Sequence, residues 1–114
     1  MPNATGTAAV SPGVLLFTVP LNKKGKIDAI NIDNEGTHGR IQFILQDNFS
    51  QDVSANNNAV TARAAEPWTE AVDQNAGGFW DVFSLGKIEL LGSVYLIASV
   101  TDAAAVANVQ FHFE

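Results

Sequence analysis

The chain has 114 residues, no cysteine and a formal net charge of −6, from 12 acidic and 6 basic residues. This length suits one domain with its own core, and the missing cysteines exclude disulfides, thiolate metal sites and a cysteine nucleophile. The negative balance argues against nucleic acid as a partner, because phosphates attract proteins of the opposite charge. Only 16% of the residues are charged and 46% are hydrophobic. Part of the surface must therefore be uncharged, either as an ordinary skin of Asn, Gln, Thr and Ser or as a contact with another chain.

The first 13 residues are predicted to form an N-terminal arm, either flexible or docked on a partner. Residues 2–12 are small and polar, close with Ser11-Pro12-Gly13, and have too little apolar surface to order themselves. The first ten residues have no basic stretch and no long apolar stretch, so we expect no secretory signal, and we expect no membrane partner either. Residues 14–114 are predicted to form a single domain.

Alternating apolar residues predict short strands in the first half of the chain. The first strand covers 14–19 and ends at Pro20, which has no backbone donor for a ladder. The next two cover 27–34 and 40–47. They are predicted to pair as a hairpin around a loop with two glycines, 34–39.

The second half continues with shorter elements. The polar segment 48–58 is predicted to be a loop, followed by a short strand over 59–64. Pro67 and the nearby acids suit the N-terminus of a helical turn over 66–72. An aromatic strand over 79–85 and a short strand or extended corner over 87–91 come next.

The last segment, 86–114, is predicted to hold two antiparallel strands around one turn. Apolar and polar residues alternate over 94–100 and again over 108–113, on either side of a turn at 101–103. A period of two is typical of a strand with one face in a core. The whole pattern is seven or eight short strands with regular turns. It predicts an all-β fold, an antiparallel two-sheet β-sandwich that is jelly-roll-like.

The two histidines lack the neighbours of a catalytic site. His38 lies in a glycine-rich loop, and His112 lies on a strand between two phenylalanines. Neither is in the sequence context of a nucleophile elbow or a triad. We therefore expect no catalytic residue and no enzymatic activity, and we expect His112 to be a partly exposed cross-strand partner.

Two loops carry side chains that can ligate a metal ion: Glu35 with His38, and Asp47-Asn48 with Asp52. The second loop lacks the glycine and the late bidentate glutamate of a calcium loop. Asp and Asn are also the ordinary residues of any turn. We expect no metal site and no other cofactor.

An aromatic residue among acids can indicate sugar binding. Trp68 lies close in sequence to Glu66, Glu70 and Asp73. A tryptophan can stack on a sugar ring, and paired carboxylates can hydrolyse a glycoside. The alternative is an aromatic cap over the open end of a sandwich.

Two stretches of the sequence together resemble small β-sandwich virion proteins of tailed bacteriophages. The first is FTVP at 17–20 with KGKIDAINIDN at 24–34, and the second is GKIELLGSVYLIAS at 86–99. In that group, a T-V-P…K…I…I…N-G hairpin precedes an L-x-x-G-x-x-L-x-x-x-A-S strand and a last strand rich in Val and Phe. The likeness covers about residues 14–47 and 79–114, with Ser93-Val94 in place of the usual Asp-Thr pair.

The resemblance implies a virion protein that forms a homo-oligomer, often a trimer. Its leading interpretation is a capsid decoration (cement) protein that is made in the host cytoplasm, binds the outer capsid surface and bridges subunits of the major capsid protein. The alternative is a collar, tail or fibre module that binds a host-surface glycan. The residues predicted to make assembly contacts belong to the arm or are aromatic anchors: Asn3, Thr5, Val10, Pro12, Trp68 and Trp80. Phe79 is a further aromatic candidate, and a place in the core is the alternative for all three aromatic residues.

Overall fold

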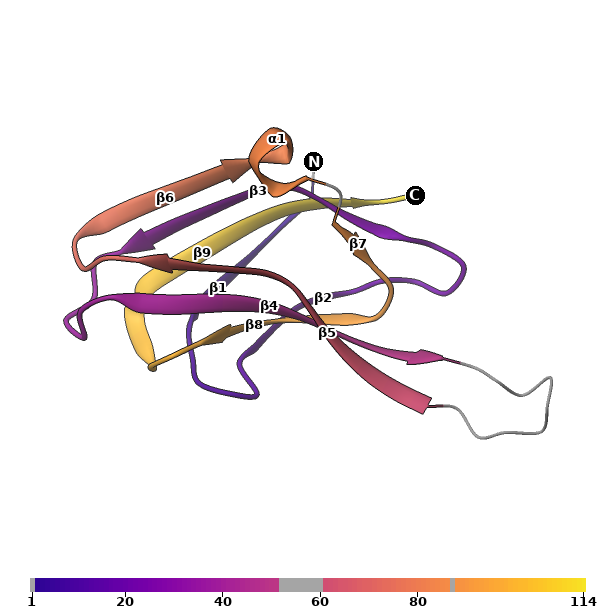
Figure 1. Cartoon of the computed structure of the whole chain (residues 1–114), viewed down its shortest axis with the longest axis horizontal. Helices are drawn as coiled ribbons and strands as arrows, with labels where there is room; N and C mark the ends of the chain where they lie inside the picture. The colour runs from indigo at the N-terminus through magenta and orange to yellow at the C-terminus, as the bar shows by residue number, and fades with distance from the viewer. Residues whose placement is uncertain (1, 52–60, 87) are drawn as a thin grey trace.

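The computed structural model is a two-layer β-sandwich (Figure 1), as the sequence predicts. It describes residues 2–51, 61–86 and 88–114. The elements in chain order are β1 (Asn3–Ala8), β2 (Val14–Thr18), β3 (Gly25–Asn34), β4 (Ile41–Gln51), β5 (Thr61–Val72), β6 (Ala76–Asp81), α1 (Val82–Leu85), β7 (Glu89–Leu90), β8 (Ser93–Ala98) and β9 (Asp102–Phe113). In the described parts of the chain, no helix has the length and apolar character needed to cross a membrane.

The strands pair from the outside of the chain inward, as in one long hairpin that has been rolled up. β1 pairs with β9, β2 with β8, β3 with β6, and β4 with β5. Successive pairs fall in alternate layers, so the first sheet has the order β1-β9-β3-β6 and the second has the order β2-β8-β4-β5. This is the arrangement of an eight-stranded jelly roll. The predicted jelly-roll-like sandwich is confirmed, and β7 is a two-residue addition that pairs with the start of β3.

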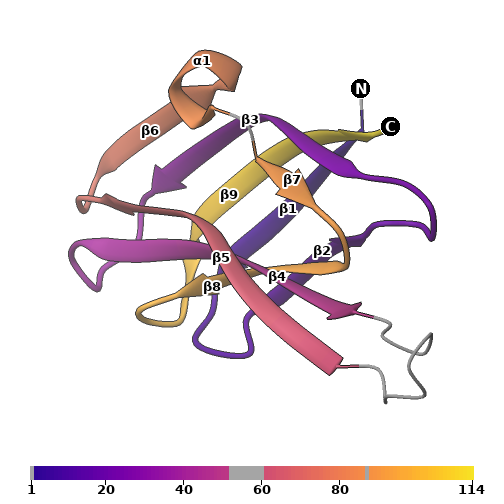
Figure 2. The same ribbon diagram turned by 45° about the vertical axis from the view of Figure 1, so that its right-hand side comes forward.

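Both predicted hairpins are wrong. β3 and β4 lie in different sheets, and so do β8 and β9, so the connections between them cross from one layer to the other (Figure 2). The period of two shows which face of a strand is buried. A strand that crosses to the facing layer has the same period as one that folds back beside its neighbour. Among the described strands, β4 and β5 are consecutive in the chain and do pair with each other.

The middle of the chain also differs from its prediction. β5 is a continuous strand through Pro67, in place of the predicted helical turn. Pro67 is tolerated because β5 is an edge strand, where a missing donor can face away from the neighbouring strand. Strand β4 continues to Gln51, so the predicted loop 48–58 begins as strand, and its remainder lies outside the described residues. The same holds for the start of the predicted strand 59–64.

The predicted aromatic strand over 79–85 ends early. β6 stops at Asp81, whose Oδ1 accepts hydrogen bonds from the backbone N–H groups of Phe83 and Ser84, each at 3.0 Å. This carboxylate caps the start of the short α1, because it satisfies donors that have no partner within the helix.

The core lies between the inner faces of the two sheets. Trp68 of β5 and Trp80 of β6 meet edge to face across the layers, with ring centroids 5.3 Å apart. At another point Phe17 of β2 stacks on Phe111 of β9 at 4.0 Å. The largest fully buried apolar side chains are Phe43, Ile30, Ile32, Ile41, Leu45, Leu90, Leu96, Val94 and Val109.

The segment predicted to be an arm is part of the sandwich over residues 3–8. β1 pairs with β9 along its length, and Gly6 and Ala8 are buried. The small residues that suggested disorder allow this packing: a Cβ on Gly6 would lie only 3.3 Å from Leu16 Cδ2 of the facing β2. The turn that follows is held by backbone hydrogen bonds, from Gly13 N to Val10 O at 2.8 Å and from Ala98 N to Ala9 O at 2.8 Å.

Candidate functional site

Charged side chains are spread unevenly over the molecule. The first one in the chain is Lys23, so residues 1–22 carry none. Strands β1 and β2 both lie in this segment, and they are the edges of the two sheets on the same side of the sandwich. The opposite side is formed by β5 and β6, whose described residues include Glu66, Glu70 and Asp81. We call residues 2–18 the uncharged edge.

Four of the six residues predicted to make assembly contacts lie on the uncharged edge. Asn3 and Thr5 are exposed on β1, and Val10 and Pro12 are exposed in the turn that leads to β2. Leu15 of β2 joins them and is 51% exposed. The sequence carried a signal for Leu15, because the strand over 14–19 is apolar on both faces and one of those faces must lie outside.

The backbone of β1 has one open side. Among the described residues, β1 pairs only with β9. Phe111 N donates to Pro2 O at 3.1 Å, and bonding residues alternate along an antiparallel ladder. Ala4 and Gly6 therefore bond to β9, and the odd-numbered residues of β1 direct their backbone N–H and C=O groups toward the open edge.

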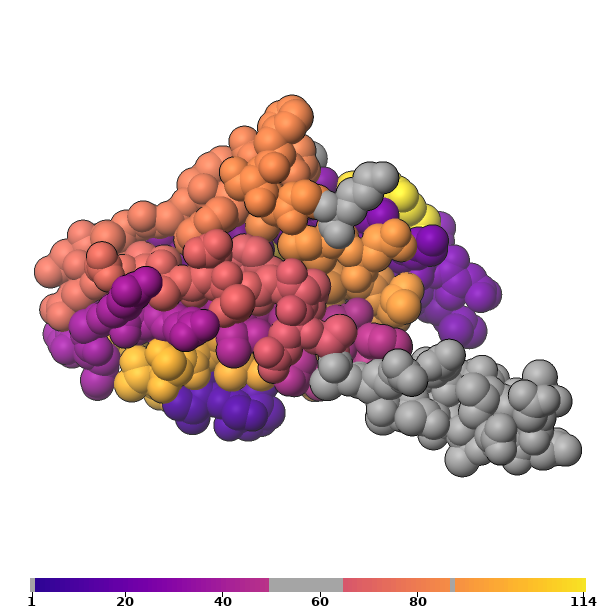
Figure 3. All heavy atoms as spheres, in the orientation of Figure 1, coloured from indigo at the N-terminus to yellow at the C-terminus, as the bar shows by residue number. Residues whose placement is uncertain are grey.

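The two tryptophans do not join the uncharged edge. Trp68 is buried and Trp80 is partly buried against the core, which is the alternative that the sequence left open. Trp68 therefore has no free face for stacking on a sugar. Phe79, which precedes Trp80 on β6, is 65% exposed, and Phe83 is 92% exposed on α1, which projects from the body of the molecule (Figure 3). Sequence reasoning missed Phe83, since it placed this residue inside a strand.

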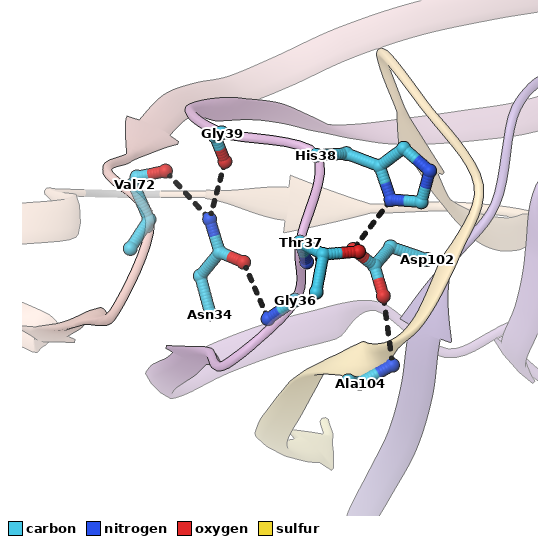
Figure 4. Close-up of polar contacts among 8 residues, drawn as sticks. All are labelled: Asn34, Gly36, Thr37, His38, Gly39, Val72, Asp102 and Ala104. Carbon is cyan, nitrogen blue, oxygen red and sulfur yellow. Dashed lines mark hydrogen bonds and ion pairs between the residues drawn. The ribbon is translucent and has the colours of Figure 1, made fainter.

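At one end of the sandwich, a buried side chain holds the loop between β3 and β4 (Figure 4). Asn34 is fully buried, and its Nδ2 donates to the carbonyl oxygens of Gly39 and Val72, each at 3.0 Å. Its Oδ1 accepts a hydrogen bond from Gly36 N at 3.2 Å. One amide group thus links the loop to the end of β5.

Asp102 holds the same loop from β9. It accepts hydrogen bonds from Thr37 N at 3.0 Å, from Ala104 N at 3.0 Å and from His38 Nδ1 at 2.8 Å. The hydrogen bond from His38 lowers the pKa of Asp102, and the backbone N–H of Ala104 adds to this effect. The pair has the geometry of the acid and base in a catalytic triad, but no hydroxyl group of the described residues hydrogen-bonds to His38. What this arrangement accomplishes is to fix the loop.

At the other end, His112 of β9 lies between two acids. Its Nδ1 is 2.9 Å from each carboxylate oxygen of Asp28, and its Nε2 is 3.1 Å from Glu114 Oε1. His112 is opposite Lys26 on β3 and is partly exposed, so the prediction of a partly exposed cross-strand partner is confirmed. The hydrogen bond to Asp28, followed by the one to Glu114, raises the pKa of His112.

We expect the pKa of His112 in the folded protein to exceed 6.5, because both carboxylates stabilise the imidazolium. The ion pair then stabilises the fold at pH values below 6.5, and this contribution is lost as pH rises through the folded pKa. An NMR titration of the ring protons measures the midpoint. Asp28→Asn should lower it further than Glu114→Gln does. A midpoint unchanged in Asp28→Asn would contradict the assignment.

The loops considered as metal sites have other uses. Asp47 is buried, and its carboxylate oxygens accept hydrogen bonds from Leu91 N at 2.8 Å and from Gly92 N at 2.9 Å. It therefore anchors the connection between β7 and β8 to β4, while Asp52 lies outside the described residues. Within the described ranges, no group of three or more His, Cys, Asp or Glu side chains is arranged to hold a metal ion.

The polar side chains at the two ends of the sandwich are thus engaged within the chain itself. The uncharged edge differs from them, since it combines exposed apolar side chains with backbone groups that point outward. Its chemistry suits contact with another polypeptide. No protein-family model, curated protein or solved structure matches this chain.

Proposed function

We propose that this chain is a non-enzymatic structural protein that joins other proteins through its uncharged edge, as a decoration protein on the outer surface of a phage head. The observation that carries the proposal is the edge itself. An acidic protein keeps one side free of charged side chains and exposes Val10 and Leu15 there. Exposed apolar groups in an uncharged setting favour burial against another protein.

The jelly roll is compatible with this role, but the fold by itself does not distinguish this role from others. The fold occurs in viral capsid proteins and in lectins, and function is set by the site that the fold carries. Its two sheets share one packed core and therefore form a stiff block. A stiff block that bridges neighbouring subunits of the major capsid protein gains from effective concentration, because each later contact is intramolecular. The acidic side would then face solvent, away from packaged DNA.

Purified chain is expected to bind heads that lack it, and Val10→Asp is expected to weaken this binding at least about tenfold, since a carboxylate would be buried without a partner. Val82→Asp is the matched control. Val82 is 45% exposed and Val10 49%, but Val82 lies on α1, next to the opposite side of the sandwich. Cosedimentation with heads measures both. Equal binding by the two variants, or no binding of the unmodified chain, would contradict the proposal.

A second candidate, the glycan-binding module, is favoured by one row of residues. Thr5, Asn108, Asn31 and Phe79 are directly opposite one another across β1, β9, β3 and β6, so they share the outer face of the first sheet. Asn108 Nδ2 donates to Thr5 Oγ1 at 3.0 Å. Amide and hydroxyl groups beside an exposed ring suit a sugar. The decoration role predicts no glycan binding by the isolated chain, and binding that Phe79→Ala abolishes would select the second candidate instead.

A further inference from the structure

We infer that β1 pairs with β1 of a second copy of this chain, in antiparallel orientation, so that the first sheets of two protomers become one continuous sheet. The pairing is isologous, with a two-fold axis through the middle of β1. This inference goes beyond the decoration role and does not depend on it.

The backbone of β1 is prepared for such a pairing. Asn3, Thr5 and Thr7 direct their N–H and C=O groups toward the open edge, as the bond between Phe111 N and Pro2 O requires. These groups have no protein partner among the described residues, whereas those of Ala4 and Gly6 face β9. An added strand would satisfy the three open residues at once.

Of the four strands at the ends of the two sheet orders, β1 is the one without the usual protection against pairing. Natural edges are blocked by charged side chains, by proline or by bulges. β5 contains Pro67 and two glutamates, β6 ends at Asp81, and β2 has a bulge between Leu15 and Phe17. β1 has no charge and no proline, and its irregularity lies only at its end, between Thr7 and Ala8.

The charge distribution selects a second copy as the occupant. Each copy has a formal net charge of −6, so two copies repel each other. This repulsion is weakest when the copies meet through a side without charged residues, because the charges then stay farthest apart. The uncharged edge is that side, and a two-fold arrangement places the two acidic sides, β5 and β6 of each copy, at opposite ends. A basic protein partner would instead be drawn to the acidic side.

The register follows from the open residues. With the two-fold axis at Thr5, Thr5 of one copy lies opposite Thr5 of the second copy, and Asn3 lies opposite Thr7 of the second copy. This arrangement overlaps the whole strand and forms about six backbone hydrogen bonds. The opposed threonines are a favourable cross-strand pair. The inference therefore specifies a dimer, where the resemblance to virion proteins implied a trimer.

Sedimentation equilibrium of the full chain, with Thr5→Pro and Thr5→Ala, tests the pairing. The N–H of Thr5 points toward the open edge, so a proline at this position leaves the hydrogen bonds to β9 in place. It removes two hydrogen bonds at the centre of the dimer, one from each copy, and places its ring there. We expect the unmodified chain and Thr5→Ala to form dimers. We expect Thr5→Pro to remain folded and to have a dissociation constant at least about 30-fold higher.

Three results would overturn the inference: a monomer at every concentration, a trimer, or a Thr5→Pro variant that dimerises normally. If Thr5→Pro does not fold, Thr7→Lys decides, since a lysine on an edge strand blocks pairing and leaves the strand intact. A folded Thr7→Lys with unchanged dimerisation overturns the inference as well. None of these measurements uses heads, so failure here leaves the decoration role standing, and failure to bind heads leaves the dimer standing.

Discussion

Asn34→Asp is expected to lower the free energy of unfolding by about 3–5 kcal/mol, because the variant keeps the shape of the side chain and reverses one of its hydrogen-bonding groups. Asn34 Nδ2 donates to the carbonyl oxygens of Gly39 and Val72. A carboxylate has no donor, so both carbonyl oxygens would face a buried negative oxygen. The side chain is fully buried, and water cannot take the place of the lost donor.

Urea denaturation of the full chain measures this effect, and Asn31→Asp is the matched control. Asn31 lies on the same strand, β3, but is exposed on its outer face. We expect the control to change stability by no more than about 0.5 kcal/mol, as is usual for surface substitutions. If both variants lost the same amount of stability, the buried amide would not be holding the loop.

Asp47→Ala is expected to lower the free energy of unfolding by about 2–4 kcal/mol. The variant leaves the N–H groups of Leu91 and Gly92 without their acceptors, and each unsatisfied donor costs about 1–2 kcal/mol, because both hydrogen bonds are only partly buried. Asp47→Asn should be intermediate, since the amide keeps one acceptor oxygen. Gly92 cannot move far to compensate, because even a Cβ at this position would collide with the carbonyl oxygen of Asn48.

The same denaturation experiment with Asp33→Ala and Asp33→Asn supplies the control, since Asp33 is exposed on β3. Small and similar effects for the two Asp33 variants, together with a graded loss for the two Asp47 variants, are the expected pattern. Equal stability of Asp47→Ala and Asp33→Ala would mean that the connection between β7 and β8 does not depend on this carboxylate.

The sequence predicts which face of an individual strand is buried, but it does not predict which strands pair with each other. The strand predicted over 27–34 and the one over 108–113 lie within β3 and β9, because their apolar residues alternate with polar ones, but β9 begins already at Asp102, inside the turn predicted at 101–103. The same alternation holds for a hairpin and for a strand that crosses to the facing sheet, so the predicted hairpins failed. Pro67 misled because a proline with acids nearby also suits the first turn of a helix, and only the sheet order shows that it lies in an edge strand, β5, where proline is tolerated.

The polar anchors were missed because they act over long separations in sequence. Asn34 reads as an ordinary turn residue, and its partner Val72 is 38 positions away. Asp102 and Thr37 are 65 positions apart. Asp47 was considered as a metal ligand, since a lone sequence cannot show that two backbone N–H groups from another strand connection occupy it.

The uncharged edge was only half visible in the sequence. The absence of charge before Lys23 can be read directly, but the contacts of Asn3, Thr5, Val10 and Pro12 were predicted for another reason: the small, polar segment 2–12 suggested an extended arm. That prediction assumed a separate arm. In the jelly roll this segment instead forms β1 and β2, the edge strands on one side of the sandwich. The predicted contact therefore belongs to an open strand edge and not to an extended tail.

Amide hydrogen exchange along β1, followed by NMR at increasing protein concentration, tests most directly whether this edge joins one protein to another. We predict that the amides of Asn3, Thr5 and Thr7 exchange fast in dilute solution and become protected as the chain associates, while Ala4 and Gly6 stay protected throughout. Fast exchange of the three odd-numbered amides at every concentration, in a chain that nevertheless associates, would show that the contact lies elsewhere on the molecule.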